Sequence, residues 1–269
     1  MCRFIETIRV ERGQACNLQL HQARVDATMA RFFPGSPGVS LAGILSLDPG
    51  WDGVKCRVVY GRGGAESVTY APYAMRPVAT LRLVEADIDY GYKFEDRRQI
   101  DRAFAMRGDC DDVLIVRRGM VADTSIANVA FGDGREWFTP RHPLLPGTRR
   151  AALLRDGVVG ELDIRVVDIP RFSHIMLFNA MIPWGACCLP SGSIRRAASA
   201  HAVGRPGIEF VLQHPFSRSH APRTAFRYGP FCMAVWPVSP IRKGRFAMLF
   251  GGCGNPLDAR RLPVVAVFA

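Results

Sequence analysis

Lys93 is the first residue whose type suggests chemistry, because lysine is scarce in this chain while arginine is abundant. It lies in "DYGYKFEDR", residues 89–97, and the only other lysines among the 35 lysines and arginines are Lys55 and Lys243. An arginine keeps its proton in a protein, whereas a lysine amine can become neutral and attack a carbonyl carbon. Lys93 is therefore a candidate nucleophile, and the alternative is an ordinary surface lysine in a loop.

Asp123 is the second candidate. It lies in "GMVADTSIANVAF", five residues before Asn128, with apolar strand residues on both sides. A carboxylate in such surroundings is costly unless it has a charged or hydrogen-bonding partner. One interpretation is a carboxylate that holds a cationic ring nitrogen, as the partner of a pyridinium does. The alternative is the acid of an Asx-turn.

Two further segments suggest a phosphate site. "LLPGTRRAALL" places Gly147 and Thr148 where a helix is expected to begin, and the free N–H groups and dipole of a helix start favour a phosphate. "HQARVDAT" places His21 and Arg24 on one helix face, and the Arg24 guanidinium can bind a phosphate with two N–H groups. The alternatives are a helix with Thr148 as its N-cap and a surface salt bridge of Arg24.

These residues together make up a site for pyridoxal 5'-phosphate (PLP). The lysine would form the imine, the carboxylate would keep the ring nitrogen protonated, and the helix start and the arginine would hold the phosphate.

Two folded regions are expected to position these residues, in a mixed α+β or α/β fold. Residues 1–76 are predicted to form a small α+β domain with a strand at "RFIETIRV", a helix at "NLQLHQARVDATMARFF" and a hairpin of "KCRVVYG" and "ESVTYAPY". Residues 79–193 are predicted to form a larger domain that binds the cofactor. It has a first strand at "TLRLVEA", a helix from about Glu95, a helix after "LLPGT", and further strands at "LDIRVVDI" and "SHIMLFNAM".

Residues 195–269 form a third region that is basic and lacks sustained periodicity. They carry +9 of the net charge of +11, so the remainder of the chain is close to neutral. We predict that this tail is irregular, poorly packed and without a role in the chemistry. Arginines beside aromatic residues could bind nucleic acid, but no known motif frames them, and we do not expect nucleic acid as a partner.

Composition excludes several other classes of protein. The chain is 48% hydrophobic and 22% charged, which suits one or two globular domains. It has no run of about 18 uncharged apolar residues, and its first residues alternate charge in a way that no secretory signal does. The eight cysteines lack C-x-x-C spacing, and the acids of "RGDCDDV" are interpreted as a polar turn. We therefore expect a cytoplasmic protein with no membrane partner and no metal.

The order of six motifs resembles a known family. "FIETIRV", "HQAR", "DYGYKFEDR", "DTSIAN", "WFTP" and "LLPGTRR" follow one another over about residues 3–193. This order resembles the class IV aminotransferases, the fold type IV PLP enzymes, which include branched-chain aminotransferases, D-amino acid aminotransferases and aminodeoxychorismate lyase. The resemblance implies a two-domain fold like that of D-amino acid aminotransferase, in a short version. "K-x-x-D-R" is closest to the small lyase-like members.

The resemblance also implies roles for individual residues. Lys93 would form the Schiff base with PLP, Asp123 would face the pyridine nitrogen with Asn128 beside it, and Arg24 would bind the phosphate through its side chain. The remaining contacts to the phosphate would come from the backbone N–H groups of Thr148 and Arg149, with Gly147 allowing close approach.

The chain departs from the family pattern in three ways. Asp123 stands where the family usually has Glu. Arg98 stands where some members have a tyrosine five residues after the lysine, and Arg97 is a candidate to replace its contact with the cofactor. The region covered by the resemblance is also shorter than is usual in the family.

The activity implied is transamination of a branched-chain or similar amino acid, with the freed Lys93 as general base. One alternative is elimination of pyruvate from an aminodeoxychorismate-like substrate, and another is a degenerate member that binds PLP without catalysis. A substrate carboxylate would bind Arg9, Arg57 or Arg97. The resemblance further implies a homodimer.

Overall fold

The computed structural model describes residues 2–196 and, as backbone, residues 265–267. The prediction that the tail after residue 195 is irregular and poorly packed therefore lies almost entirely outside the described residues. Within the described part of the chain, no helix has the length and apolar character needed to cross a membrane.

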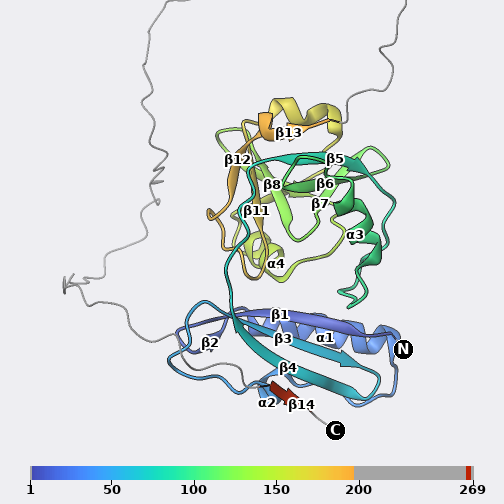
Figure 1. The fold of residues 1–269 in the computed structure, drawn as a ribbon, viewed down its shortest axis with the longest axis vertical. Coiled ribbons are helices and arrows are strands. Elements are labelled where there is room, and N and C mark those ends of the chain that lie inside the picture. Colours follow the sequence, from blue (N-terminus) through green and yellow to red (C-terminus); the bar gives the residue numbers. More distant parts are fainter. Residues whose placement is uncertain (1, 197–264, 268–269) are drawn as a thin grey trace, which may run out of the picture. The chain divides into compact units, whose positions relative to one another are not determined.

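The N-terminal region is an antiparallel sheet with a long helix along one face (Figure 1). The sheet order is β14-β4-β3-β1-β2, so that the strand at 265–267 pairs with β4, a pairing that the sequence did not predict. The elements are β1 (Phe4–Glu11), β2 (Gln14–Ala15), α1 (Leu18–Phe32), α2 (Leu41–Ile44), β3 (Val54–Gly61), β4 (Gly64–Pro72) and β14 (Val265–Val267).

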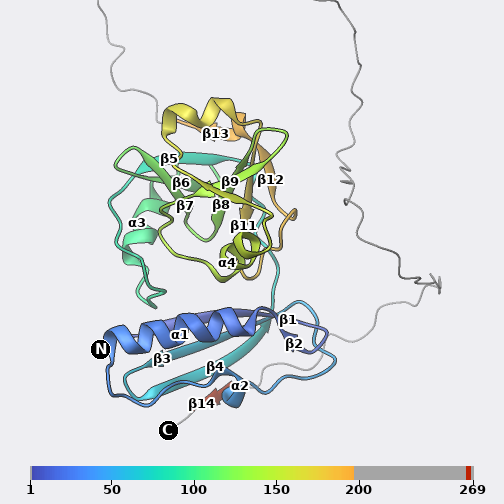
Figure 2. The same cartoon turned by 180° about the vertical axis from the view of Figure 1, so that it is seen from behind.

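The alternation of β1 explains how this sheet packs. Phe4 and Ile8 are buried in one apolar core with Val25 and Met29 of α1, which runs along the sheet in Figure 2. Because side chains on a strand alternate between its faces, Glu6 points to the same side as these apolar residues. A carboxylate is therefore placed beneath the helix, where it needs a partner.

The second region, from residue 81 onward, contains two further sheets. Their strand orders are β13-β5-β6-β7 and β10-β9-β8-β11-β12. The elements are β5 (Leu81–Glu85), α3 (Arg98–Ala105), β6 (Asp112–Arg117), β7 (Met120–Thr124), β8 (Asn128–Gly132), β9 (Trp137–Pro140), α4 (Thr148–Arg155), β10 (Gly160–Leu162), the 3-10 helix η1 (Val166–Arg171), β11 (His174–Phe178), β12 (Cys188–Pro190), the 3-10 helix η2 (Ser191–Ser193) and β13 (Ile194–Arg195).

Two expectations for this region need correction. The segment "LDIRVVDI" is not one strand, because β10 ends at Leu162 and the 3-10 helix η1 follows. Asp168 accepts a hydrogen bond from the backbone N–H of Arg165 at 3.2 Å, which closes the first turn of η1, and Pro170 lies inside this helix. The helix expected from about Glu95 begins at Arg98, so that Lys93 stays in an extended segment.

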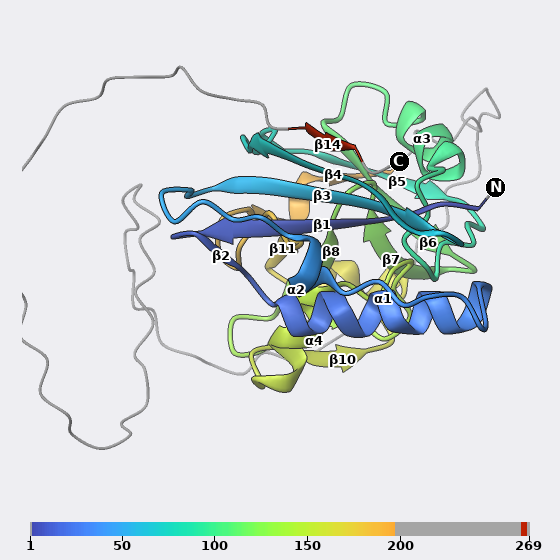
Figure 3. The ribbon, with the colours of Figure 1, turned by 90° about the horizontal axis from the view of Figure 1, so that it is seen from below.

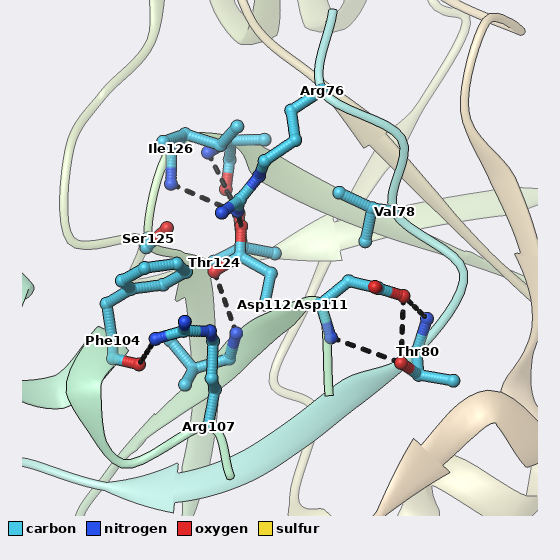
Figure 4. A network of polar contacts seen from close by, with 12 residues as sticks. Arg76, Val78, Thr80, Phe104, Arg107, Asp111, Asp112, Thr124, Ser125 and Ile126 are labelled. Carbon is cyan, nitrogen blue, oxygen red and sulfur yellow. Dashed lines mark hydrogen bonds and ion pairs between the residues drawn. The ribbon is translucent and has the colours of Figure 1, made fainter. Parts of the chain in front are cut away.

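The acids of "RGDCDDV" hold the turn that leads into β6. Asp111 Oδ2 accepts hydrogen bonds from the backbone N–H groups of Ala79 and Thr80, both at 2.9 Å, and from Thr80 Oγ1 at 2.8 Å. Figure 4 shows the contacts of Asp111 with Thr80 beside Asp112, which is fully buried. Asp111 therefore connects the start of β6 to the residues that lead into β5.

Candidate functional site

Lys93 is held in place by backbone pairing with β1. The backbone N–H of Ile5 donates to the carbonyl of Lys93 at 2.9 Å, and Phe4 and Phe94 form an antiparallel bridge. The N–H of Glu95 donates to the carbonyl of Arg3, also at 2.9 Å. The segment around Lys93 thus runs along β1 like a short extra strand, and this pairing fixes the direction of the lysine side chain.

The Lys93 side chain lines a cavity of about 500 Å³. Most of the residues predicted to bind PLP line the same cavity, although they are up to 124 residues apart in sequence. They are Arg24, Lys93, Asp123, Asn128, Gly147 and Thr148.

The cavity disfavours a charge on Lys93. Burial, followed by the positive charge of Arg24, lowers the pKa of Lys93 from 10.5 to about 8. The amine therefore loses its proton far more readily than that of a surface lysine. A neutral amine is the form that attacks an aldehyde or removes a proton.

Asp123 and Asn128 come together because a tight turn connects them. Asp123 lies near the end of β7 and Asn128 begins β8, and between them the N–H of Ala127 donates to Thr124 Oγ1 at 2.9 Å. Asn128 Nδ2 donates to Asp123 Oδ1 at 2.9 Å, and the N–H of Leu145 donates to Asp123 Oδ2 at 3.0 Å. The spacing of five residues is thus the length of this turn.

Burial shifts the pKa of Asp123 upward. Burial raises the pKa to about 6, although the hydrogen bonds from Asn128 and from the backbone of Leu145 act in the opposite direction. Each carboxylate oxygen has a further lone pair for a donor in the cavity. A cation next to Asp123 would lower its pKa again and keep it ionised.

A network of buried polar groups leads from β1 to α4. Glu6 is fully buried, and its carboxylate accepts from Arg24 Nε at 2.8 Å, from Arg24 Nη2 at 2.6 Å and from His21 Nδ1 at 2.5 Å. The other ring nitrogen of His21 lies 3.2 Å from Thr148 Oγ1 at the start of α4. One carboxylate therefore orients an arginine and, through a histidine, a threonine of the second region.

The protonation states of this network follow from burial and charge. Burial alone would raise the pKa of Glu6, but the charge of Arg24 and hydrogen bonds from His21 and Arg24 outweigh it and lower the pKa to about 2. Burial lowers the pKa of His21, which favours the neutral ring. With Nδ1–H donating to an ionised Glu6, Nε2 accepts from the Thr148 hydroxyl.

The start of α4 leaves backbone N–H groups available for an anion. Thr148 is not the N-cap, as one alternative had it, because Gly147 holds that position and makes no side-chain cap. The Thr148 hydroxyl is engaged with His21, so its backbone N–H is the group that remains for a phosphate. Arg24 Nη1 lies 3.5 Å from the carbonyl of Pro146, just before this helix start.

Gly147 is needed because Asn128 fills the space of a side chain. A Cβ at Gly147 would collide with Asn128 Oδ1 and would lie 3.2 Å from Asn128 Cγ. Asn128 Nδ2 also donates to the carbonyl of Leu145 at 2.9 Å. The glycine thus connects the helix start to the asparagine that holds Asp123.

The predicted arginines differ in position. Arg149 is the second residue of α4, after Thr148, but its side chain does not line the cavity. Arg9 also lies outside the cavity, bound to Glu11 at 2.5 Å and to the carbonyl of Met181 at 2.9 Å. Arg57 is likewise outside and pairs with Glu95 at 2.9 Å. Arg97 is the one of the three predicted substrate-binding arginines that lines the cavity.

Arg98, which stands where some members of the family have a tyrosine, does not line the cavity. Arg98 is exposed and pairs with Asp96, with Nη2 to Oδ2 at 2.6 Å, so it is directed away from the cavity. Arg97 and Tyr90 line the cavity instead. Arg97 Nη2 donates to the carbonyl of Ser125 at 2.8 Å, and the Tyr90 hydroxyl donates to the carbonyl of Phe94 at 2.6 Å.

Sequence reasoning gave no individual role to four residues of this site: Glu6, His21, Lys55 and Tyr90. The sequence does indicate a role for Glu6, because Glu6 is an acid on the apolar face of a predicted strand that precedes "HQAR". Lys55 had the same scarcity as Lys93. Tyr90 had no such signal, since the turn that brings it to the cavity is irregular.

Comparisons with known proteins agree with this geometry. A family model described as class IV amino-transferase matches residues 98–188. An uncharacterized protein of Haemophilus influenzae is 35% identical over 187 residues, which cover 67% of this chain and 98% of that protein. The crystal structure of a putative 4-amino-4-deoxychorismate lyase from Haemophilus somnus is 31% identical, with a TM-score of 0.61, and the match covers 67% of this chain and 97% of that one.

A third similarity concerns the fold alone. A hypothetical aminotransferase from Mycobacterium tuberculosis in its PLP-bound form is 18% identical, with a TM-score of 0.55, over 71% of this chain and 81% of that one. The prediction of a mixed α/β fold of type IV is thereby confirmed. The matches cover 98% and 97% of the two Haemophilus proteins, so these proteins share the short length of the region that carries the motifs here.

We expect Glu6→Gln to destabilise the protein by about 3 kcal/mol at pH 7, because it leaves the buried charge of Arg24 without its partner. The pKa of Glu6 is lowered to about 2, so its contribution is complete above pH 4.5 and decreases as the pH falls from 4.5 towards 2. Urea unfolding at pH 7 and at pH 3.5 would measure a large difference from wild type at the first pH and a smaller one at the second. Glu66→Gln, at a partly exposed ion pair with Arg3, is the control; equal effects of the two variants would contradict the prediction.

We expect Lys93→Met to stabilise the PLP-free protein at pH 7 by about 1–3 kcal/mol, because a charge is removed from the cavity while the side-chain stem is retained. The pKa of Lys93 is about 8 in the folded protein against 10.5, so the cost of its charge is complete below pH 8 and is lost between pH 8 and 10.5. Urea unfolding should therefore show a gain at pH 7 that shrinks by pH 10. A variant less stable than wild type at pH 7 would refute the lowered pKa.

We expect Gly147→Ala to weaken PLP binding by about 10- to 100-fold, because the new methyl group displaces Asn128 from Asp123 and from the helix start. Fluorescence titration with PLP measures the affinity, and circular dichroism checks the fold. Gly63→Ala, in a hairpin turn with no atom within 4 Å of the added methyl group, is the control. An unchanged affinity of Gly147→Ala would show that Asn128 and the helix start play no part in binding.

Proposed function

We propose that this chain, which belongs to the class IV aminotransferase family of PLP-dependent enzymes, binds PLP through Lys93 and eliminates pyruvate from an aminodeoxychorismate-like substrate. The observation that carries the proposal is a single cavity lined by Lys93, Asp123 and the start of α4. The similarity to the Haemophilus somnus protein, described as a putative lyase, supports elimination.

The residues present fit PLP. Lys93 is a lysine with a lowered pKa, as a group that condenses with an aldehyde requires. Asp123 is a buried carboxylate with free lone pairs for a ring nitrogen. The uncapped N–H groups at Gly147 and Thr148, with Arg24 nearby, suit a phosphate.

The chain's own residues would act mainly on protons. PLP, when bound, supplies an electron sink for the electron pair left after a proton leaves the carbon that bears the substrate amine. Lys93 Nζ is the base that takes this proton, and its lowered pKa makes the neutral form accessible near pH 7–8. The bond between the neighbouring ring carbon and the enolpyruvyl oxygen would then break, with its electron pair leaving on that oxygen. The Lys93 ammonium would return a proton to the departing enolpyruvate, which becomes pyruvate.

Asp123, and Glu6 with its partners Arg24 and His21, would hold the cofactor in position and would not take part in proton transfer. Asp123, fixed by Asn128 and the backbone of Leu145, accepts a hydrogen bond from a protonated ring nitrogen. Glu6 holds Arg24 and His21, so the phosphate site is preorganised. We also propose that the enzyme works as a homodimer, as its family does; sedimentation velocity of the PLP-loaded protein tests this.

Transamination of a branched-chain or similar amino acid is the second candidate. The family model that matches residues 98–188 is described as an amino-transferase, which favours it. Both reactions begin with proton removal by Lys93, so the product distinguishes them. Release of a 2-oxo acid from a branched-chain amino acid, with an amino acceptor required, would identify transamination.

We expect purified protein with PLP to be labelled irreversibly at Lys93 by borohydride, because reduction fixes the imine that its amine forms. Peptide mass spectrometry locates the label, and Lys93→Ala should show none. The same preparation should release pyruvate from 4-amino-4-deoxychorismate, measured with lactate dehydrogenase, and Lys93→Ala should not. Labelling without turnover of this substrate or of any amino acid would favour a degenerate member; no labelling at Lys93 would refute the proposal.

A further inference from the structure

Lys55 is a second lysine of the same cavity, and the chemistry described above does not use it. It lies on β3 and lines the cavity with Lys93. The described part of the chain has only these two lysines. A chain that otherwise uses arginine thus places both of them at one site.

The face of the sheet on which Lys55 lies is the one opposite α1. Its neighbours in β3, Val54 and Cys56, are buried in the core beneath α1. Because side chains alternate along a strand, Lys55 points to the other face, as Arg9 does directly across from it on β1. Lys55 therefore reaches the cavity from the sheet, whereas Arg24 reaches it from the helix.

The other cations around the cavity are already paired. Arg24 is bound to Glu6 at 2.6 Å, and Arg97 lies 3.8 Å from Asp101. Arg76 lies 3.5 Å from Asp112 and has its guanidinium 4.8 Å from the centre of the Phe104 ring, as Figure 4 illustrates.

Lys55 differs from these arginines. Within residues 2–196, no hydrogen bond or ion pair involves its side chain. Its neighbour Arg9 is neutralised by Glu11 at 2.5 Å, so the ammonium of Lys55 is the charge left over on this part of the sheet. A carboxylate bound in the cavity would give this charge a partner.

We propose that Lys55 binds one of the two carboxylates of the substrate and so selects for a substrate that carries it. This inference rests on the proposed function. Arg97 also lines the cavity, and its contacts are one hydrogen bond to the carbonyl of Ser125 and a 3.8 Å ion pair with the largely exposed Asp101, so further N–H donors remain for the second carboxylate. The anion-binding groups then fall into two sets, with Arg24 and the start of α4 for a phosphate and Lys55 and Arg97 for the substrate.

The role of Lys55 is one of binding and specificity. Its ammonium is a compact point charge on a flexible stem, so it can follow a carboxylate that changes position during the reaction. An ion pair inside a partly enclosed cavity is less screened by salt than one on the surface. Loss of Lys55 should therefore raise KM more than it lowers kcat, because the contact is present before and during the reaction.

The test measures binding of chorismate to the PLP-loaded protein by calorimetry. Chorismate carries two carboxylates but has a hydroxyl in place of the amine, so it reports binding without chemistry. Because a hydrogen bond to a charged group contributes about 1.5–3 kcal/mol, Lys55→Met should weaken binding by about 10- to 100-fold, and Lys55→Arg should restore most of it. Benzoate, with one carboxylate, should bind weakly to all variants.

Arg62→Met is the matched control. It removes one positive charge from the hairpin that joins β3 and β4, at a residue that does not line the cavity. Chorismate affinity should not change in this variant, and PLP labelling at Lys93 should be normal in all of them. Equal chorismate binding by wild type and Lys55→Met, an equal loss in Arg62→Met, or no chorismate binding by wild type would overturn the inference.

The outcomes separate this inference from the proposed function. Normal labelling at Lys93 with unchanged chorismate binding in Lys55→Met would leave the enzyme assignment intact and remove Lys55 from the site. Chorismate binding that depends on Lys55, in protein incubated with PLP that shows no labelling at Lys93, would support the carboxylate site while the proposed function fails.

Discussion

The buried carboxylate of Glu6 is the group on which the candidate site depends. It lies on β1 among apolar side chains, and its burial is tolerable only because Arg24 and His21 of α1 donate three hydrogen bonds to it. The network continues from His21 to Thr148 at the start of α4. A single buried charge thus sets the position of an arginine, a histidine and a helix start. Backbone pairing of β1 with the segment of Lys93 adds the lysine to the same framework.

Burial shifts the two central ionisable groups in opposite directions. The pKa of Lys93 falls to about 8 and that of Asp123 rises to about 6, and in both cases burial is the largest cause. Each group is thereby brought towards its neutral form, at a cost in stability to the empty protein. A ligand with a cationic ring nitrogen and an aldehyde removes both costs, since the first pairs with Asp123 and the second consumes the amine. Strained electrostatics of this kind are typical of functional sites.

Much of the fold and the site could be predicted where residue type and spacing act locally. The alternation of β1, the helix of "HQAR" and the spacing of Asp123 and Asn128 are set by neighbours in sequence, and so they were found, whereas the turn between these two residues was expected to be part of a strand. The 3-10 helix at Val166–Arg171 was missed because its apolar run fits a strand equally well, and a side-chain contact of Asp168 decides the outcome. Tyr90 reaches the cavity through an irregular segment, whose path depends on contacts distant in sequence. The roles of Arg9 and Arg57 could not be settled from sequence because their partners, Met181 and Glu95, come from distant segments.

The two faces of the small sheet carry different charged residues. The face towards α1 carries Glu6, which orients Arg24 and, through His21, Thr148 for an anion. The opposite face carries Lys55, which lines the cavity and whose side chain makes no hydrogen bond or ion pair within residues 2–196. Because the period of a strand is two residues, a shift of register by one turns the side chains of the shifted strand to the other face. In β1 it would expose Glu6, and in β3 it would bury Lys55 beneath the helix. The apolar residues Phe4 and Ile8 oppose such a shift, since they would leave the core together with Glu6. The hydrophobic pattern that folds the sheet therefore also keeps Glu6 beneath α1 and Lys55 on the opposite face, the arrangement that the proposed binding of a phosphate and of a substrate carboxylate requires.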